Sequence, residues 1–237
     1  MIGLIILVIV CSITYSIEII FGLGGTILML PLLTWYFDAK TLVIYSVVPQ
    51  IMVAAIGLYY SPRTVDRRFL SGMLLFAILG AAAGIAAFTH VSSGQFKILL
   101  GLAVLAAGIY LITAPQVFRI APATGRALDV AAGFSQGLFG ISGPVSMTRL
   151  LGTFTDKTIV RNAGFAFFLS LNIARGIFYW VTGSVDPMVV TMALVSMPAL
   201  AAALLVANRL HFQLRQETFR RVAAWLIALG GISILLN

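Results

Sequence analysis

Apolar runs of about twenty residues recur along the whole of this 237-residue chain, and their length decides the fold class. A helix needs about 20 apolar residues to cross a hydrocarbon core of about 30 Å, because it rises about 1.5 Å per residue. The chain is 61% hydrophobic and 9% charged, and only short loops separate the runs, which leaves no room for a soluble domain. We therefore expect an all-α polytopic membrane protein that functions within the bilayer.

Two of the runs are interrupted by glycine-rich breaks. The first run extends from Met1 to about 36 and breaks at 22–25, while the second extends from about 128 to about 154 and breaks at 140–143. The breaks read FGLGG and FGISG, and each opens one half of the chain. Three uninterrupted runs follow each break, at 42–60, 69–88 and 96–112, and at 158–182, 187–207 and 218–236. We interpret this pattern as two repeats, 1–118 and 119–237.

The length of the half-helices predicts the topology of the repeats. The segments 128–139 and 144–154 measure about 18 and 17 Å, which is too short to cross, so they should form a re-entrant hairpin. A hairpin plus three crossings in each half would invert one repeat relative to the other. The stretch from Met1 to Phe21 measures about 31 Å and is long enough to cross, so the topology of the first broken helix stays open.

The distribution of positive charge favours inverted repeats. This topology leaves only Lys40 and Lys97 on one face and collects the other loop cations on the opposite face, as expected of the cytoplasmic side. The cations assigned to the cytoplasmic face are Arg63, Arg67, Arg68, Arg119, Arg126, Arg149, Lys157, Arg161, Arg209, Arg215, Arg220 and Arg221. The basic excess is thus explained without a nucleic-acid partner.

A break inside the bilayer indicates an internal site, because unpaired backbone groups are tolerated there only in a cavity or against protein. Half-helices beginning near Thr26 and Pro144 would present free N–H groups and about half a positive charge each, and Ser142 is expected to cap the second. We predict an anion site that includes Gly22, Gly24, Gly25, Thr26, Gly140, Ser142 and Gly143. The alternative is that the glycines only allow helices to cross closely.

The motifs GLGGTILMLPLL (22–33) and GISGPVSMTRLL (140–151) resemble those of the sulfite exporter TauE/SafE family, and the similarity covers essentially the full length. The chain departs from the pattern at Ser142, which replaces a third glycine, and at Arg149, where the first copy has Pro31. The resemblance implies secondary transport, in the direction of export, of small sulfur-containing anions such as sulfite or organosulfonates. It also implies a location in the bacterial inner membrane.

Polar residues at membrane depth are further candidates, because burying them is costly. Arg175 would attract the anion or snorkel to the interface, and Arg149 would line the inner vestibule or snorkel. Gln50 and Asn172 would complete the hydrogen bonds of the anion or join helices. Glu18, one turn before the first break, would carry a proton during transport, or stay protonated, or pair with an arginine.

Other functions stay open at this stage. The pattern G-x-S-G at 140–143 resembles the nucleophile motif of rhomboid proteases, but both histidines, His90 and His211, are expected in loops, away from the serine. An anion channel or an assembly factor could share the fold. The single cysteine, Cys11, excludes an intramolecular disulfide and a cysteine metal cluster, and we expect neither metal nor cofactor. The expected partners are a small anion and the lipid bilayer, and a homodimer stays open.

Overall fold

The structure is a computed structural model that describes residues 2–61, 65–113, 120–210 and 231–236. Over these ranges the regular structure is helical, without a strand, in agreement with the predicted all-α class. The helices are α1 (Ile2–Phe21), α2 (Gly25–Leu33), α3 (Ala39–Tyr45), α4 (Val47–Tyr59), α5 (Arg67–His90), α6 (Ser93–Thr113), α7 (Pro122–Phe139), α8 (Gly143–Leu151), α9 (Lys157–Val181) and α10 (Pro187–Leu210).

Six helical segments in the described ranges are long and apolar enough to cross a membrane. They are α1, α3 with α4, α5, α6, α9 and α10, so five of the six predicted spans are present. The predicted span 218–236 lies outside the described residues except for 231–236, which are helical. Apolar side chains such as Ile5, Ile9 and Ile13 of α1 are exposed on the outer surface, as in a multi-pass membrane protein.

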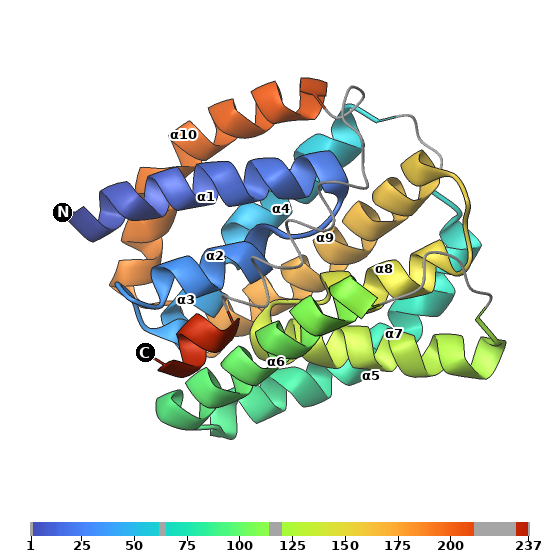
Figure 1. Ribbon diagram of the computed structural model, residues 1–237, viewed down its shortest axis with the longest axis horizontal. Helices are drawn as coiled ribbons and strands as arrows, with labels where there is room; N and C mark the ends of the chain where they lie inside the picture. The colour runs from blue at the N-terminus through green and yellow to red at the C-terminus, as the bar shows by residue number, and fades with distance from the viewer. Residues whose placement is uncertain (1, 62–64, 114–119, 211–230, 237) are drawn as a thin grey trace.

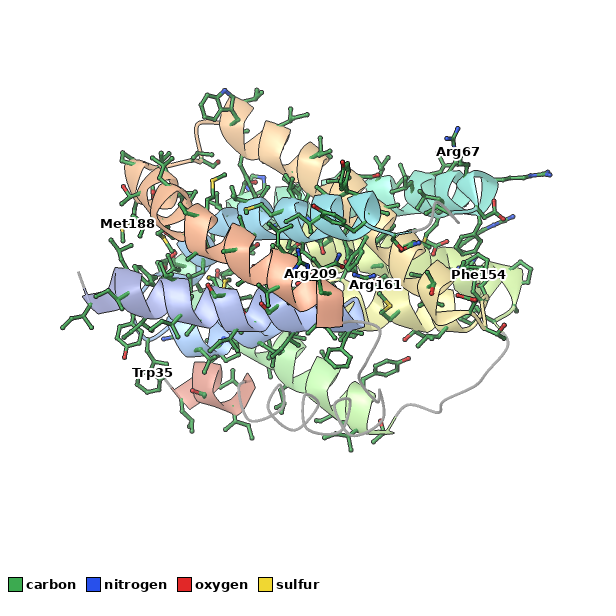
Figure 2. The ribbon with its side chains drawn as sticks, turned by 90° about the horizontal axis from the view of Figure 1, so that it is seen from above. Trp35, Arg67, Phe154, Arg161, Met188 and Arg209 are labelled. Carbon is green, nitrogen blue, oxygen red and sulfur yellow. The ribbon has the colours of Figure 1, made fainter. Side chains whose placement is uncertain are left out.

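The broken helices form two hairpins, α1 with α2 and α7 with α8, that return to opposite ends of the molecule (Figure 1). A Cβ on Gly3 would lie 3.2 Å from the ring of Phe37, so the first hairpin closes where α1 begins. In the second hairpin, Nε of Arg149 lies 3.3 Å from the Asp129 carboxylate. Figure 2 places Trp35, just after α2, at one end and Phe154, just after α8, at the other.

The second hairpin is longer than predicted. Helix α7 begins at Pro122 rather than at 128 and has 18 residues, or about 27 Å. Proline suits the first turn of a helix because the missing N–H has no partner there, and the preceding Ala121 is extended. The predicted length of about 18 Å was therefore wrong, and the return of the chain rests on the contact between Asp129 and Arg149. An inverted relation between 1–118 and 119–237 stays a prediction.

Close packing of α5 against α7 fixes the second hairpin in place. Gly80 of α5 lies against the carbonyl of Val130, and Gly133 of α7 lies against the carbonyl of Ala77, where a Cβ would overlap the backbone. Small residues let two helices approach to backbone contact. Helices α1 and α10, and α4 and α9, form the other main pairs, and the breaks lie among them.

Candidate functional site

The two glycine-rich breaks lie side by side in the interior. A Cβ on Gly143 would lie 3.3 Å from Cβ of Leu23 in the first break. Gln50 of α4 joins the two, because its Nε2 donates to Oγ1 of Thr26 and, at 2.8 Å, to the carbonyl of Gly140. Residues that belong to different halves of the sequence therefore form one site.

A cavity lies between the breaks. Its polar and glycine lining comprises Glu18, Gly24, Thr26, Gln50, Gln136, Gly140, Ser142 and Gly143. Its volume is about 20 Å³, which is room for about one water molecule. An anion with three or four oxygens is larger than water, so the surrounding hairpins must separate to admit one.

Glycine is required at the breaks for two reasons. Gly22, Gly24 and Gly140 have positive φ values of 82°, 118° and 70°, a conformation that side chains disfavour. Gly25 has no positive φ, but a Cβ there would overlap the carboxylate of Glu18 and the ring of Tyr15. The glycines thus set both the turns and the close approach of α1 to α2.

Neutral amides connect the site to three long helices. Gln136 of α7 donates through Nε2 to Oε1 of Gln50 at 2.8 Å and to Oδ1 of Asn172 at 3.1 Å. Asn172 of α9 donates through Nδ2 to Oε1 of Gln50 at 2.5 Å. All three side chains are almost completely buried, with exposed fractions of 5% or less. Such a network has to be well satisfied, because an unpaired amide in the interior is costly.

Arg175 of α9 is the cation nearest the second break. Its side chain is fully buried, which excludes the alternative that it snorkels to the interface. It donates from Nη1 to Oδ1 of Asn172 at 2.8 Å and from Nη2 to the carbonyl of Val43 at 3.2 Å. A Cβ on Gly140 would lie 2.9 Å from its Nη2.

The charge of Arg175 has only neutral partners. Among the described residues, no carboxylate lies within 4.0 Å of it, and its Nε has no hydrogen-bond partner. The ring of Tyr179 lies 5.5 Å from the guanidinium carbon and partly shields the charge. A buried cation without a counter-ion is costly, and an anion beside it would lower that cost.

The local geometry explains how Arg175 reaches a backbone carbonyl. The predicted span 42–60 is divided at Ser46 into α3 and α4, because Pro49 has no N–H to continue the hydrogen bonds of the helix. The hydroxyl of Ser46 donates to the carbonyl of Val43 at 2.7 Å, and Arg175 donates to the same oxygen.

The first break contains its own negative group. The carboxylate of Glu18 lies against Gly25 and Thr26, the first two residues of α2, since a Cβ on Gly25 would overlap its Oε2. Thr26 is further bonded to the hydroxyl of Tyr15 at 3.0 Å. The positive end of α2 is thus occupied by a side chain of the protein.

The second break has no corresponding carboxylate. Ser142 stands at the N-cap position of α8 but makes no capping bond, so the predicted capping role was wrong. Its hydroxyl donates to Oε1 of Gln136 at 2.7 Å. Gln136 corresponds in the repeat to Glu18, which is the signal by which the sequence could have identified it as a site residue.

Several of the predicted site residues do not line the cavity. Gly22, Gly25, Asn172 and Arg175 do not line it, although the last three contact residues that do. Arg149 pairs with Asp129 at 3.3 Å, so its side chain does not snorkel freely, and its place in the inner vestibule stays a prediction. That carboxylate, buried on α7, was missed by sequence reasoning.

Arg161 was assigned to a cytoplasmic loop, but it lies within α9 and is 4% exposed. Its Nε donates to the carbonyl of Ile19 near the end of α1 at 3.1 Å, and its Nη2 donates to Oδ1 of Asn208 at 2.7 Å (Figure 2). A cation at a helix C-terminus is favourable, which explains why this residue turns inward.

Comparison with known proteins identifies the family. The family model described as "Sulfite exporter TauE/SafE" matches residues 6–234. The chain belongs to the TauE/SafE family. A curated relative, "Probable sulfite/organosulfonate exporter TauE" of Cupriavidus necator, is 25% identical over 177 residues, which cover 73% of this chain and 69% of the relative. No solved structure gives a significant match.

The TauE/SafE family is a family of transporters. The surroundings of Ser142 agree with this assignment and not with a serine protease. The acceptor of the Ser142 hydroxyl is an amide oxygen, which is too weak a base for serine catalysis. His90 lies exposed at the end of α5, and His211 lies outside the described residues. Within the described ranges, no group of three or more His, Cys, Asp or Glu residues could hold a metal ion.

Proposed function

We propose that this TauE/SafE protein exports sulfite or a related organosulfonate across the bacterial inner membrane and binds the anion at the second helix break. The observation that carries the proposal is the buried charge of Arg175, which lies against Gly140 with only neutral partners. The uncapped N-terminus of α8 adds a second source of positive potential at the same place.

The amides of the site supply the remaining contacts for an oxyanion. Gln50, Gln136 and Ser142 line the cavity and carry N–H or O–H donors that are now bonded to acceptors within the protein. On anion binding, these donors exchange an internal acceptor for an oxygen of the substrate. The exchange replaces the hydration shell that the anion loses on entering the bilayer.

The first break supports coupling to protons. Glu18 lines the same cavity, so its carboxylate repels an anion at close range in a medium of low dielectric constant. Binding of the substrate anion becomes favourable when Glu18 takes up a proton, because the carboxyl group is then neutral and no longer repels it. The titratable side chain beside it is Tyr15 on α1, while Arg161 reaches α1 at the carbonyl of Ile19.

Alternating access then follows from the two hairpins. The hairpins return to opposite ends of the molecule and meet at a cavity that is too small for the substrate. Separation of the hairpins at one end at a time would expose the anion to one face and then the other, as expected if 1–118 and 119–237 are inverted repeats. Assembly as a homodimer stays a prediction.

Transport in proteoliposomes tests the proposal. The purified full chain is reconstituted, and efflux of labelled sulfite is followed with and without an imposed pH gradient. A carrier saturates with sulfite and responds to the pH gradient, whereas a channel follows the gradient of the anion alone. An assembly factor gives no flux. Arg175→Met should abolish the flux, and unchanged flux in this variant would contradict the assignment of the site.

A further inference from the structure

A second cavity adjoins the candidate anion site. It lies between α6 and the hairpin of α7 and α8 and has a volume of about 300 Å³. Ile141 and Pro144 line both cavities, so the two cavities meet at the second break. The far wall is made by small side chains of α6, including Ala103 and Ala107.

The polar groups of this second cavity are already paired. The hydroxyls of Tyr110 and Thr148 are bonded to each other, and Thr148 also donates to the carbonyl of Pro144 at 2.7 Å. Ser135 donates to the carbonyl of Ile141. A water molecule needs two to four free polar partners, and a cavity that lacks them favours apolar contents.

The size of the cavity sets the size of its contents. An apolar cavity of about 150 Å³ holds benzene, so the space here suits an alkyl chain or ring system of up to about twice that size. Sulfite, which has no apolar part, cannot fill it.

We propose that the second cavity receives the apolar part of an organosulfonate whose sulfonate group lies at the helix breaks. This inference rests on the proposed function, because it takes the head-group site as given. It makes α6 the helix that selects among sulfonates, while the breaks recognise the charge that all of them share.

A series of alkanesulfonates tests the inference. Inhibition of sulfite transport by the reconstituted full chain is measured for methanesulfonate, butanesulfonate and octanesulfonate. Each added methylene should tighten inhibition about fourfold until the cavity is full. An octyl ammonium salt controls for effects of the amphiphile on the membrane.

Ala107→Phe fills the cavity and should lower the ratio of octanesulfonate to methanesulfonate affinity at least tenfold. Leu102→Phe is the matched control, because Leu102 lies on the outer surface of the same helix and is 50% exposed. Its ratio should stay within about twofold of the original.

The outcomes separate the inference from the proposed function. Equal inhibition by all chain lengths, with sulfite still transported, overturns the second site and leaves the anion site standing. The same result together with a phospholipid that is retained by the original protein and lost in Ala107→Phe assigns the cavity to a lipid chain and also overturns the inference. Absence of sulfite transport altogether overturns the proposed function itself.

Discussion

The two helix breaks share a backbone pattern but differ in charge. At the first break, the carboxylate of Glu18 lies against the N-terminus of α2, so its positive potential is already matched. At the second break, the corresponding side chain is the neutral Gln136, and the buried Arg175 adds a positive charge that has no counter-ion among the described residues. If the two halves are repeats, as predicted, the two helix ends are equivalent in position, and the side chains around them favour the second as the proposed anion site.

Arg175→Met should have the largest effect on this contrast, because it removes the charge that distinguishes the second break. We expect transport at low sulfite concentration to fall at least about a hundredfold, since an isolated charge acts strongly in a low dielectric. The variant should melt no lower than the original protein, because the buried charge has no counter-ion to leave behind. Arg175→Lys keeps the charge but loses the planar guanidinium group, so its transport rate should lie between those of the original protein and Arg175→Met. Near-normal transport in the methionine variant would refute the contrast.

Gln136→Glu would make the second break resemble the first. We expect anion affinity to fall about thirtyfold at neutral or higher pH, because a carboxylate would then face the anion and pair with the neighbouring cation. Affinity should recover as the pH is lowered and the new carboxyl takes up a proton. Gln136→Met removes the hydrogen bonds without adding charge, so its affinity for the anion should fall only a few-fold. Equal losses in the two variants, measured by sulfite binding, would show that charge is not the cause.

Glu18→Gln would make the first break resemble the second. In the original protein, transport should fall about tenfold as the pH rises and the Glu18 proton is lost, and the variant should show a flat profile. Methanesulfonate is the better substrate here, because its own charge does not change over the range. Asp38→Asn is a suitable control, since Asp38 caps α3 at an exposed position and asparagine caps equally well. A profile that is unchanged in Glu18→Gln would exclude this residue as the proton carrier.

Ser142→Ala should have the smallest effect, a two- to fivefold loss of anion affinity. The hydroxyl donates to Gln136 and does not cap α8, so its removal leaves the helix end intact. The backbone φ of −125° at this position is open to alanine, so the fold should be kept. Isothermal titration with sulfite measures the loss. A loss as large as that of Arg175→Met would instead indicate that the hydroxyl contacts the anion directly.

Some features of the site followed from local rules. Breaks in a membrane helix need glycine and an internal location, so the pattern at 22–25 and 140–143 predicted buried, irregular backbone that the structure contains. Gly22, Gly24 and Gly140 have the positive φ values expected of such breaks. Polar residues within apolar runs, such as Gln50 and Asn172, were predicted at the site for the same reason, and both lie in its network.

Other features depended on partners that are distant in sequence. The ion pair of Arg149 with Asp129 depends on how α8 folds back on α7, and a helix pattern does not give that distance. Arg161 and Arg175 lie on the same helix, but one bonds to the end of α1 and the other to the bend between α3 and α4. Neither partner can be assigned until the helices are packed.

The sequence by itself determined the membrane class, the position of the breaks and the family, because hydrophobic length and glycine requirements act over a few neighbouring residues. The tertiary structure decided which break retains positive potential, because that depends on side chains from α1, α4, α7 and α9 that meet only after folding. Charge in a low dielectric acts between neighbours in space, and a carboxylate or an arginine within a few ångströms changes what the same glycine motif can bind.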